Sequence, residues 1–245
     1  MDRGLEGLSP FPRAGISPAG LRSFIESCGG EGALRSLNTE AVCARFILPS
    51  CAGGARSYCE VLEDSAEGGV GTATVFVSHA WGYAFLDVCS ALLAWSDRQE
   101  GGGDGGGGGG GGGGSPTFFW FDLFSNRQRD GVARPFEWWR AVFFSSVKSL
   151  GHTLLVLSWA DPKPLVRAWC LVEIAASLDD GCHLEVVMPP ADEAAFLGAL
   201  EERFQDVVKK LCTVDVAKAL AAINNQYVDA IKRARAENPD SNGGT

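Results

Sequence analysis

Side chains that could bind a ligand or take part in catalysis gather directly after three short apolar runs of this chain. Hydroxyl, imidazole, indole, carboxyl and amide groups all occur there, and such groups serve acid–base chemistry or bind sugar hydroxyls. They follow the runs in order: Ser78, His79 and Trp81 after the first, Asp122 and Asn126 after the second, and Trp159 after the third. A further carboxylate, Glu173, lies in the next apolar segment. The set favours a binding or catalytic site without a metal.

Each of these residues also has a purely structural interpretation. His79 could hydrogen-bond a backbone carbonyl, the tryptophans could fill the core, and Asp122 and Asn126 could serve as turn formers. No serine–histidine–aspartate arrangement is evident, and no G-x-G-x-x-G follows the first apolar run, which disfavours a phosphate-binding loop. The eight cysteines form no C-x-x-C pair, so neither a zinc site nor any other bound cofactor is expected.

Short apolar runs alternate with amphipathic segments along most of the chain. Strands are expected at 74–77, 117–123, 153–158 and 184–188, with a fifth near 213–216. Helices are expected at 85–95, 136–150, 165–178, 193–211 and 216–235. This alternation predicts an α/β fold, with a flavodoxin-like open parallel sheet of four to five strands and helices on both faces. Ligands of such sheets bind beyond the carboxyl ends of the strands, where the polar residues named above would converge.

The chain divides into segments of different character. Residues 1–65 are expected to form a helical arm packed on the following domain, with one helix capped by Ser17 and two apolar segments at 39–47 and 57–62. The α/β domain is expected at 70–236, followed by a flexible tail at 238–245. Residues 101–114 are glycine throughout except for Asp104, which predicts a disordered, dispensable insertion between a helix and a strand.

Composition excludes several classes of function. The 245-residue chain carries a net charge of −9, with no cluster of basic residues, so binding to nucleic acid or to an anionic membrane is not expected. No apolar run approaches the roughly 20 residues that span a bilayer. The N-terminus lacks a basic stretch followed by an apolar one, so we expect a cytoplasmic protein with reduced thiols.

Several motifs carry a resemblance to a known family. The segments VFVSHAW (75–81) and TLLVLSWA (153–160) resemble the first and third strands of TIR (Toll/interleukin-1 receptor) domains. The segment RAWCLVE (167–173) resembles the W-C-L-x-E stretch of plant TIR domains. Together with FWFDLFSNRQ (119–128), the set is similar to TIR-like domains of algae and other protists. The resemblance covers roughly residues 72–190.

The resemblance implies a function and a role for one carboxylate. In enzymatic TIR domains the glutamate of this stretch is essential for cleaving the bond between nicotinamide and ribose in NAD⁺, and by resemblance it corresponds to Glu173 here. NAD⁺ would then be the substrate, with Ser78, His79, Trp81, Asp122, Asn126 and Trp159 available to bind it. The alternative is a non-enzymatic module that signals through self-association or through contact with other TIR-like domains.

Overall fold

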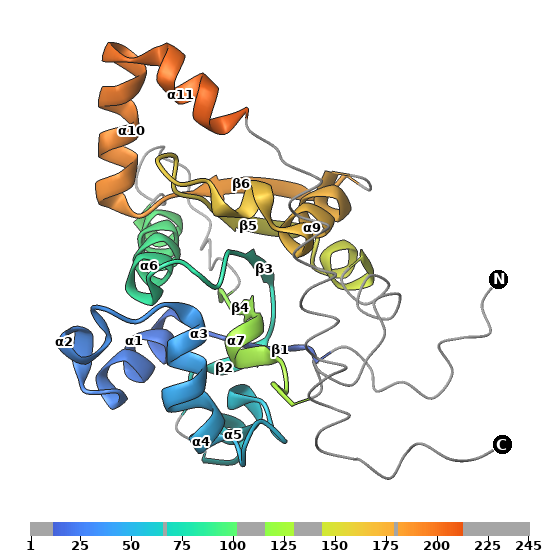
Figure 1. Ribbon diagram of the computed structural model, residues 1–245. Helices are drawn as coiled ribbons and strands as arrows, with labels where there is room; N and C mark the ends of the chain where they lie inside the picture. The colour runs from blue at the N-terminus through green and yellow to red at the C-terminus, as the bar shows by residue number, and fades with distance from the viewer. Residues whose placement is uncertain (1–11, 66–67, 102–115, 130–143, 179–180, 213–245) are drawn as a thin grey trace, which may run out of the picture.

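The computed structural model describes residues 12–65, 68–101, 116–129, 144–178 and 181–212. Six strands form one mixed sheet in the order β2-β1-β4-β3-β5-β6, with helices on both of its faces (Figure 1). The strands are β1 (Ala14–Ile16), β2 (Val70–Thr72), β3 (Val75–Ser78), β4 (Phe119–Phe121), β5 (His152–Val156) and β6 (His183–Val187). The expected α/β class is therefore confirmed, with a sheet that is mostly parallel.

The four strands expected from the sequence are β3, β4, β5 and β6, which pair in parallel. The second of them is shorter than expected, because Asp122 leaves the strand and begins the short helix α7 (Asp122–Ser125). An acidic residue in the first turn of a helix is favoured by the partial positive charge at the helix N-terminus.

The strands β1 and β2 were not expected. β1 pairs antiparallel with β2 on one side and with β4 on the other, so the N-terminal segment contributes a strand to the sheet. Each has three residues, too short for an alternating pattern to be recognised. Gly15 allows the close pairing, because a Cβ there would lie 2.8 Å from the carbonyl oxygen of Phe119.

Helices of the N-terminal segment pack beside β1. They are α1 (Pro18–Ser27), α2 (Gly30–Leu34), α3 (Thr39–Val42), the π-helical turn η1 (Cys43–Ile47), α4 (Leu48–Ser50) and α5 (Tyr58–Ser65). The start of α1 is as expected, since the Ser17 side chain accepts a hydrogen bond from the Gly20 amide at 3.0 Å. Phe24 of α1 is buried against the rings of Phe85 and Phe124, which joins this segment to the main core.

Alternation along the strands assigns side chains to two separate cores. Val75 and Val77 of β3 pack on the side of α6 (Phe85–Gly101). Phe76 stacks on Trp120 at 5.0 Å between ring centroids on the opposite side, together with Ala176 of α9 (Ala168–Leu178). Ser78 follows Phe76 by two residues and therefore faces α9, as a period of two requires.

The C-terminal part of the described chain differs from the expected helices in two places. The segment expected at 165–178 begins as a 3-10 turn, η3 (Lys163–Val166), before α9. The helix expected at 193–211 is two helices, α10 (Pro190–Glu202) and α11 (Phe204–Leu211), separated by Arg203 with a non-helical backbone. Ala199 of α10 and Val207 of α11 form one buried cluster with Trp159.

Some expectations lie outside the described residues. These are the glycine tract beyond its first residue, the strand near 213–216, the helix at 216–235 and the tail. Of the helix expected at 136–150, residues 144–150 are described and are helical. Among the helices that the structure describes, none has both the length and the apolar character needed to cross a bilayer.

Candidate functional site

Five of the predicted site residues come together at the carboxyl ends of β3 and β4. Ser78 ends β3, His79 and Trp81 follow it, Asp122 starts α7 directly after β4, and Glu173 reaches them from α9. The neighbouring parallel strands end at the same edge of the sheet, which explains how residues far apart in the sequence meet there.

Glu173 is buried on the inner face of α9, with 9% of its surface exposed. The Ser78 hydroxyl donates a hydrogen bond of 2.5 Å to Glu173 Oε2. Burial raises the pKa of Glu173 from 4.5 to about 8; the Ser78 hydrogen bond opposes this shift and the negative charge of Asp122 adds to it. The carboxyl group is therefore mostly protonated at neutral pH. Ser177, one turn further along α9, lies 2.9 Å from Thr153 Oγ1 of β5 and holds the helix against the sheet.

Asp122 is the second carboxyl group of the cluster. The indole N–H of Trp81 donates a hydrogen bond of 2.6 Å to its Oδ2. Burial raises the pKa of Asp122 to about 6, and the hydrogen bond from Trp81 limits the shift. The other oxygen, Oδ1, is buried and has no hydrogen-bond partner among the described residues. The two carboxyl groups thus titrate at different pH, as in sites that use one acid and one base.

His79 directly follows β3 and lies beside Asp122, which directly follows β4. Its Nδ1 is 3.9 Å from Asp122 Oδ1, and its ring meets the ring of Phe121 edge-on. Burial lowers the pKa of His79 to about 3, so the imidazole is neutral and the contact with Asp122 is not an ion pair. Within the described chain His79 Nε2 is buried without a hydrogen-bond partner, which is uncommon in a purely structural core histidine.

Arg167 and Cys170 complete the surroundings of the carboxyl groups. The positive charge of Arg167, which precedes α9, lowers the pKa of both Glu173 and Asp122 and so opposes the effect of burial. Arg167 begins the RAWCLVE segment but was not among the predicted site residues. Cys170 donates to the His79 carbonyl at 3.4 Å, and burial raises its thiol pKa, which makes it a poor nucleophile.

The other two predicted residues have different surroundings. The backbone N–H of Asn126 donates a hydrogen bond to the backbone carbonyl of Asp122, and the backbone carbonyl of Asn126 accepts one from the Gln128 side chain. These bonds form a turn after α7. Trp159 packs against Phe196 of α10 and below the ammonium group of Lys210 of α11. These described contacts do not join Trp159 to Glu173 or Asp122.

A cavity of about 310 Å³ lies along the same edge of the sheet, beyond β5. Tyr83, Ser158, Asp161 and Lys163 are among the residues that line it. The Tyr83 hydroxyl accepts hydrogen bonds from the amides of Ser158 and Lys163 and donates to the Asp161 carbonyl. The volume of this cavity is in the range of small-molecule sites. None of these four residues was among the predicted site residues, although Tyr83 lies two residues after Trp81 of the VFVSHAW segment.

Comparison of the chain with protein-family models, with curated proteins and with solved structures finds no significant match.

Proposed function

We propose that this chain is a TIR-like domain that cleaves the bond between nicotinamide and ribose in NAD⁺, with Glu173 as the catalytic carboxylate. The observation that supports this most is the position of Glu173. Its side chain is buried, and its Oε2 accepts a hydrogen bond from the Ser78 hydroxyl. An outward-facing glutamate, or one paired with a cation, would have argued against catalysis.

The order of the parallel strands also supports the proposal. In chain order β3, β4, β5 and β6 are the first to fourth parallel strands, and their spatial order is second, first, third, fourth. A flavodoxin-like sheet begins with the same order and binds its ligand where the order reverses. That point lies between β3 and β5, next to Ser78 and Ser158.

The chemistry required of Glu173 is electrostatic. The bond between C1′ of the ribose and the nicotinamide nitrogen breaks with its electron pair passing to the ring, so nicotinamide leaves neutral and the ribose becomes cationic. An ionised carboxylate beside C1′ stabilises that cation. Water then forms the new C1′–O bond and loses its proton to a carboxylate of the site, giving ADP-ribose. The approach of the positively charged nicotinamide ring favours the ionised form of Glu173.

The test is nicotinamide release from NAD⁺, measured by chromatography at high protein concentration, because TIR enzymes often act when assembled. We expect release by the wild type and at least about 100-fold less by Glu173→Ala, the usual effect of losing one electrostatic contact to a transition state. Glu193→Ala is the control, since this exposed carboxylate pairs only loosely with Arg98 at 3.7 Å. Equal rates in wild type and Glu173→Ala would contradict the proposal.

The dependence of kcat/KM on pH gives a second, independent prediction. Because the ionised form of Glu173 is the active one and its pKa is about 8, kcat/KM is expected to rise between pH 6.5 and pH 8. Circular dichroism at each pH would confirm that the protein stays folded. A rate that falls over this range would mean that protonated Glu173 acts, as a general acid, and would contradict the proposed role.

A non-enzymatic interaction module is the second candidate. Apolar side chains on α10 and α11 are exposed in the described part of the chain, with Leu197 and Phe204 each 57% exposed. Exposed apolar residues of this kind are typical of contact surfaces. A wild-type protein that self-associates in sedimentation experiments and releases no nicotinamide in the associated state would favour this function.

A further inference from the structure

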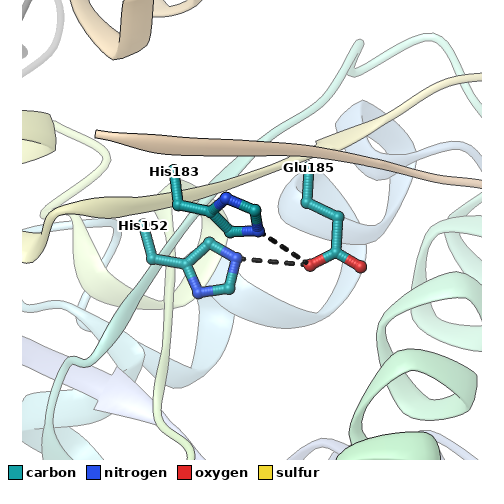
Figure 2. Close-up of side chains that lie close together, drawn as sticks. All are labelled: His152, His183 and Glu185. Carbon is teal, nitrogen blue, oxygen red and sulfur yellow. Dashed lines mark ion pairs between the residues drawn. The ribbon is translucent and has the colours of Figure 1, made fainter. Parts of the chain in front are cut away.

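Two histidines and a glutamate gather at the amino-terminal ends of β5 and β6, opposite to the edge that carries Glu173 (Figure 2). His152 is the first residue of β5 and pairs in register with His183, the first residue of β6. Glu185 is two residues further along β6, so it lies on the same face of the sheet as His183. This face is the one covered by α6, since Leu154 and Val156 of β5 belong to the core on that side.

The distances between the three side chains suit a shared ion. The Nε2 atoms of His152 and His183 lie 3.4 Å and 3.8 Å from Glu185 Oε2. The three ligand atoms all lie within 4.8 Å of one another. In a tetrahedral zinc site with bonds of about 2.0 Å, ligand atoms are separated by roughly 3.3 Å. Small side-chain rotations would bring the three atoms to that separation, because the strand pairing already places their backbones side by side.

The surroundings resemble the outer shell of a metal site. Trp95 of α6 donates a hydrogen bond of 2.8 Å from its indole N–H to Glu185 Oε2, which fixes the carboxylate. The same indole meets the His152 ring edge-on at 5.5 Å. Hydrogen bonds of this kind orient the ligands of bound metals. His152 Nε2 is buried and, among the described residues, faces Glu185 Oε2 at 3.4 Å, so an ion between the two atoms would replace this contact.

The cluster is open on one side. The side chain of His183 is 68% exposed, and that of Glu185 is 34% exposed. An ion held there could be reached from solvent and would keep water as a further ligand.

We propose that His152, His183 and Glu185 bind one divalent transition-metal ion of the Zn²⁺ class, with water in the remaining position. Two imidazole nitrogens favour such an ion over Mg²⁺ or Ca²⁺, which prefer oxygen ligands. The sequence predicts no zinc site, because its cysteines form no C-x-x-C pair and its histidines lie far from paired thiols. The proposal is independent of NAD⁺ cleavage, since the two clusters lie at opposite ends of the strands and on opposite faces of the sheet.

The experiment is a calorimetric titration of the chelator-treated full chain with Zn²⁺. One ion is expected to bind per chain, and His183→Ala and Glu185→Gln are each expected to weaken binding at least tenfold, as loss of a ligand does at least as much as loss of an outer-shell contact. Because the His183 side chain is largely exposed, His183→Ala should fold normally. Glu193→Gln, which changes an exposed carboxylate outside the cluster, is the matched control and should bind as the wild type does.

Zn²⁺ binding by free thiols must be distinguished from binding at this site, because Cys212 is exposed. Cys212→Ser should leave Zn²⁺ binding unchanged, and the Co²⁺-loaded protein should show the visible absorption of a tetrahedral ion without a thiolate charge-transfer band. The proposal would be overturned by wild-type affinity in His183→Ala, by a titration with no heat of binding, or by a thiolate band that disappears in Cys212→Ser.

Discussion

Replacing Glu173 by glutamine is expected to increase the free energy of unfolding at pH 8 by a few kcal/mol. The wild-type protein holds a carboxyl group whose pKa rises from 4.5 to about 8 on burial. Each unit of such a shift corresponds to about 1.4 kcal/mol. Glutamine has nearly the same shape as the protonated carboxyl group and never ionises, so it avoids the cost of keeping Glu173 protonated or of burying its charge.

The sign of the effect follows from proton binding. A carboxyl group whose pKa is higher in the folded state stabilises the fold fully below pH 4.5 and loses this contribution as pH rises toward 8. The stabilising contribution of Asp122 is also lost as pH rises, but this loss is complete at about pH 6. The pKa of His79 is lowered to about 3, so its effect has the opposite sign: it reduces stability as pH falls, and only below about pH 6.5. Between pH 6.5 and pH 8 the contribution of this cluster therefore comes from Glu173.

The measurement is urea unfolding at several pH values within that window. For the wild type, stability should decrease by on the order of 2 kcal/mol from pH 6.5 to pH 8. Glu173→Gln should show almost no slope, whereas the control Glu193→Gln should keep the wild-type slope. A Glu173→Gln protein that is less stable than the wild type at pH 8, with the slope unchanged, would show that the carboxyl group has a structural role instead.

Such a result would also bear on function. A residue that serves packing loses stability when it is replaced, whereas a residue retained for chemistry often reduces the stability of the protein that carries it. A variant that is more stable and releases less nicotinamide would combine both signs of a catalytic group. A variant that is more stable and equally active would assign Glu173 to neither role.

Replacing Phe24 by alanine is expected to lower the free energy of unfolding by about 3–5 kcal/mol, the usual cost of removing a buried aromatic ring. Phe24 is 3% exposed. Its ring lies 4.9 Å from that of Phe124, 5.1 Å from Tyr58 and 5.8 Å from Phe85, between centroids. These partners come from α7, α5 and α6, so the N-terminal segment and the α/β part share one core.

The same unfolding experiment tests this, with a change elsewhere in the chain as its control. Shortening residues 101–114 to four residues should leave both stability and the nicotinamide assay unchanged, because changes in loop length have a small entropic cost. If Phe24→Ala were as stable as the wild type, the N-terminal segment would not be part of the core. If the shortened protein failed to fold, the assignment of the flanking helix and strand would be wrong.

The central strands could be predicted because β3, β4 and β5 are apolar runs bounded by polar residues. β1 could not, because a three-residue strand has no period and pairs with β4, more than a hundred residues later. Ser78 and Asp122 could be brought together from the rule that parallel strands present one ligand-binding edge, whereas Glu173, on α9, was expected in the site from the resemblance of RAWCLVE. Trp159 could not be excluded, because its contacts come from α10 and α11. His152 and His183 required the register of β5 and β6, which no local pattern contains.

The hydrogen bond between Ser177 and Thr153 has a consequence for how the site would work. It fastens α9 to β5 one helical turn from Glu173, and the Ser177 hydroxyl also lies 2.8 Å from the Glu173 carbonyl. The carboxyl group is thus held by the framework before any substrate arrives. A preorganised dipole needs no reorientation during the reaction, and this is the condition under which electrostatic stabilisation is most effective.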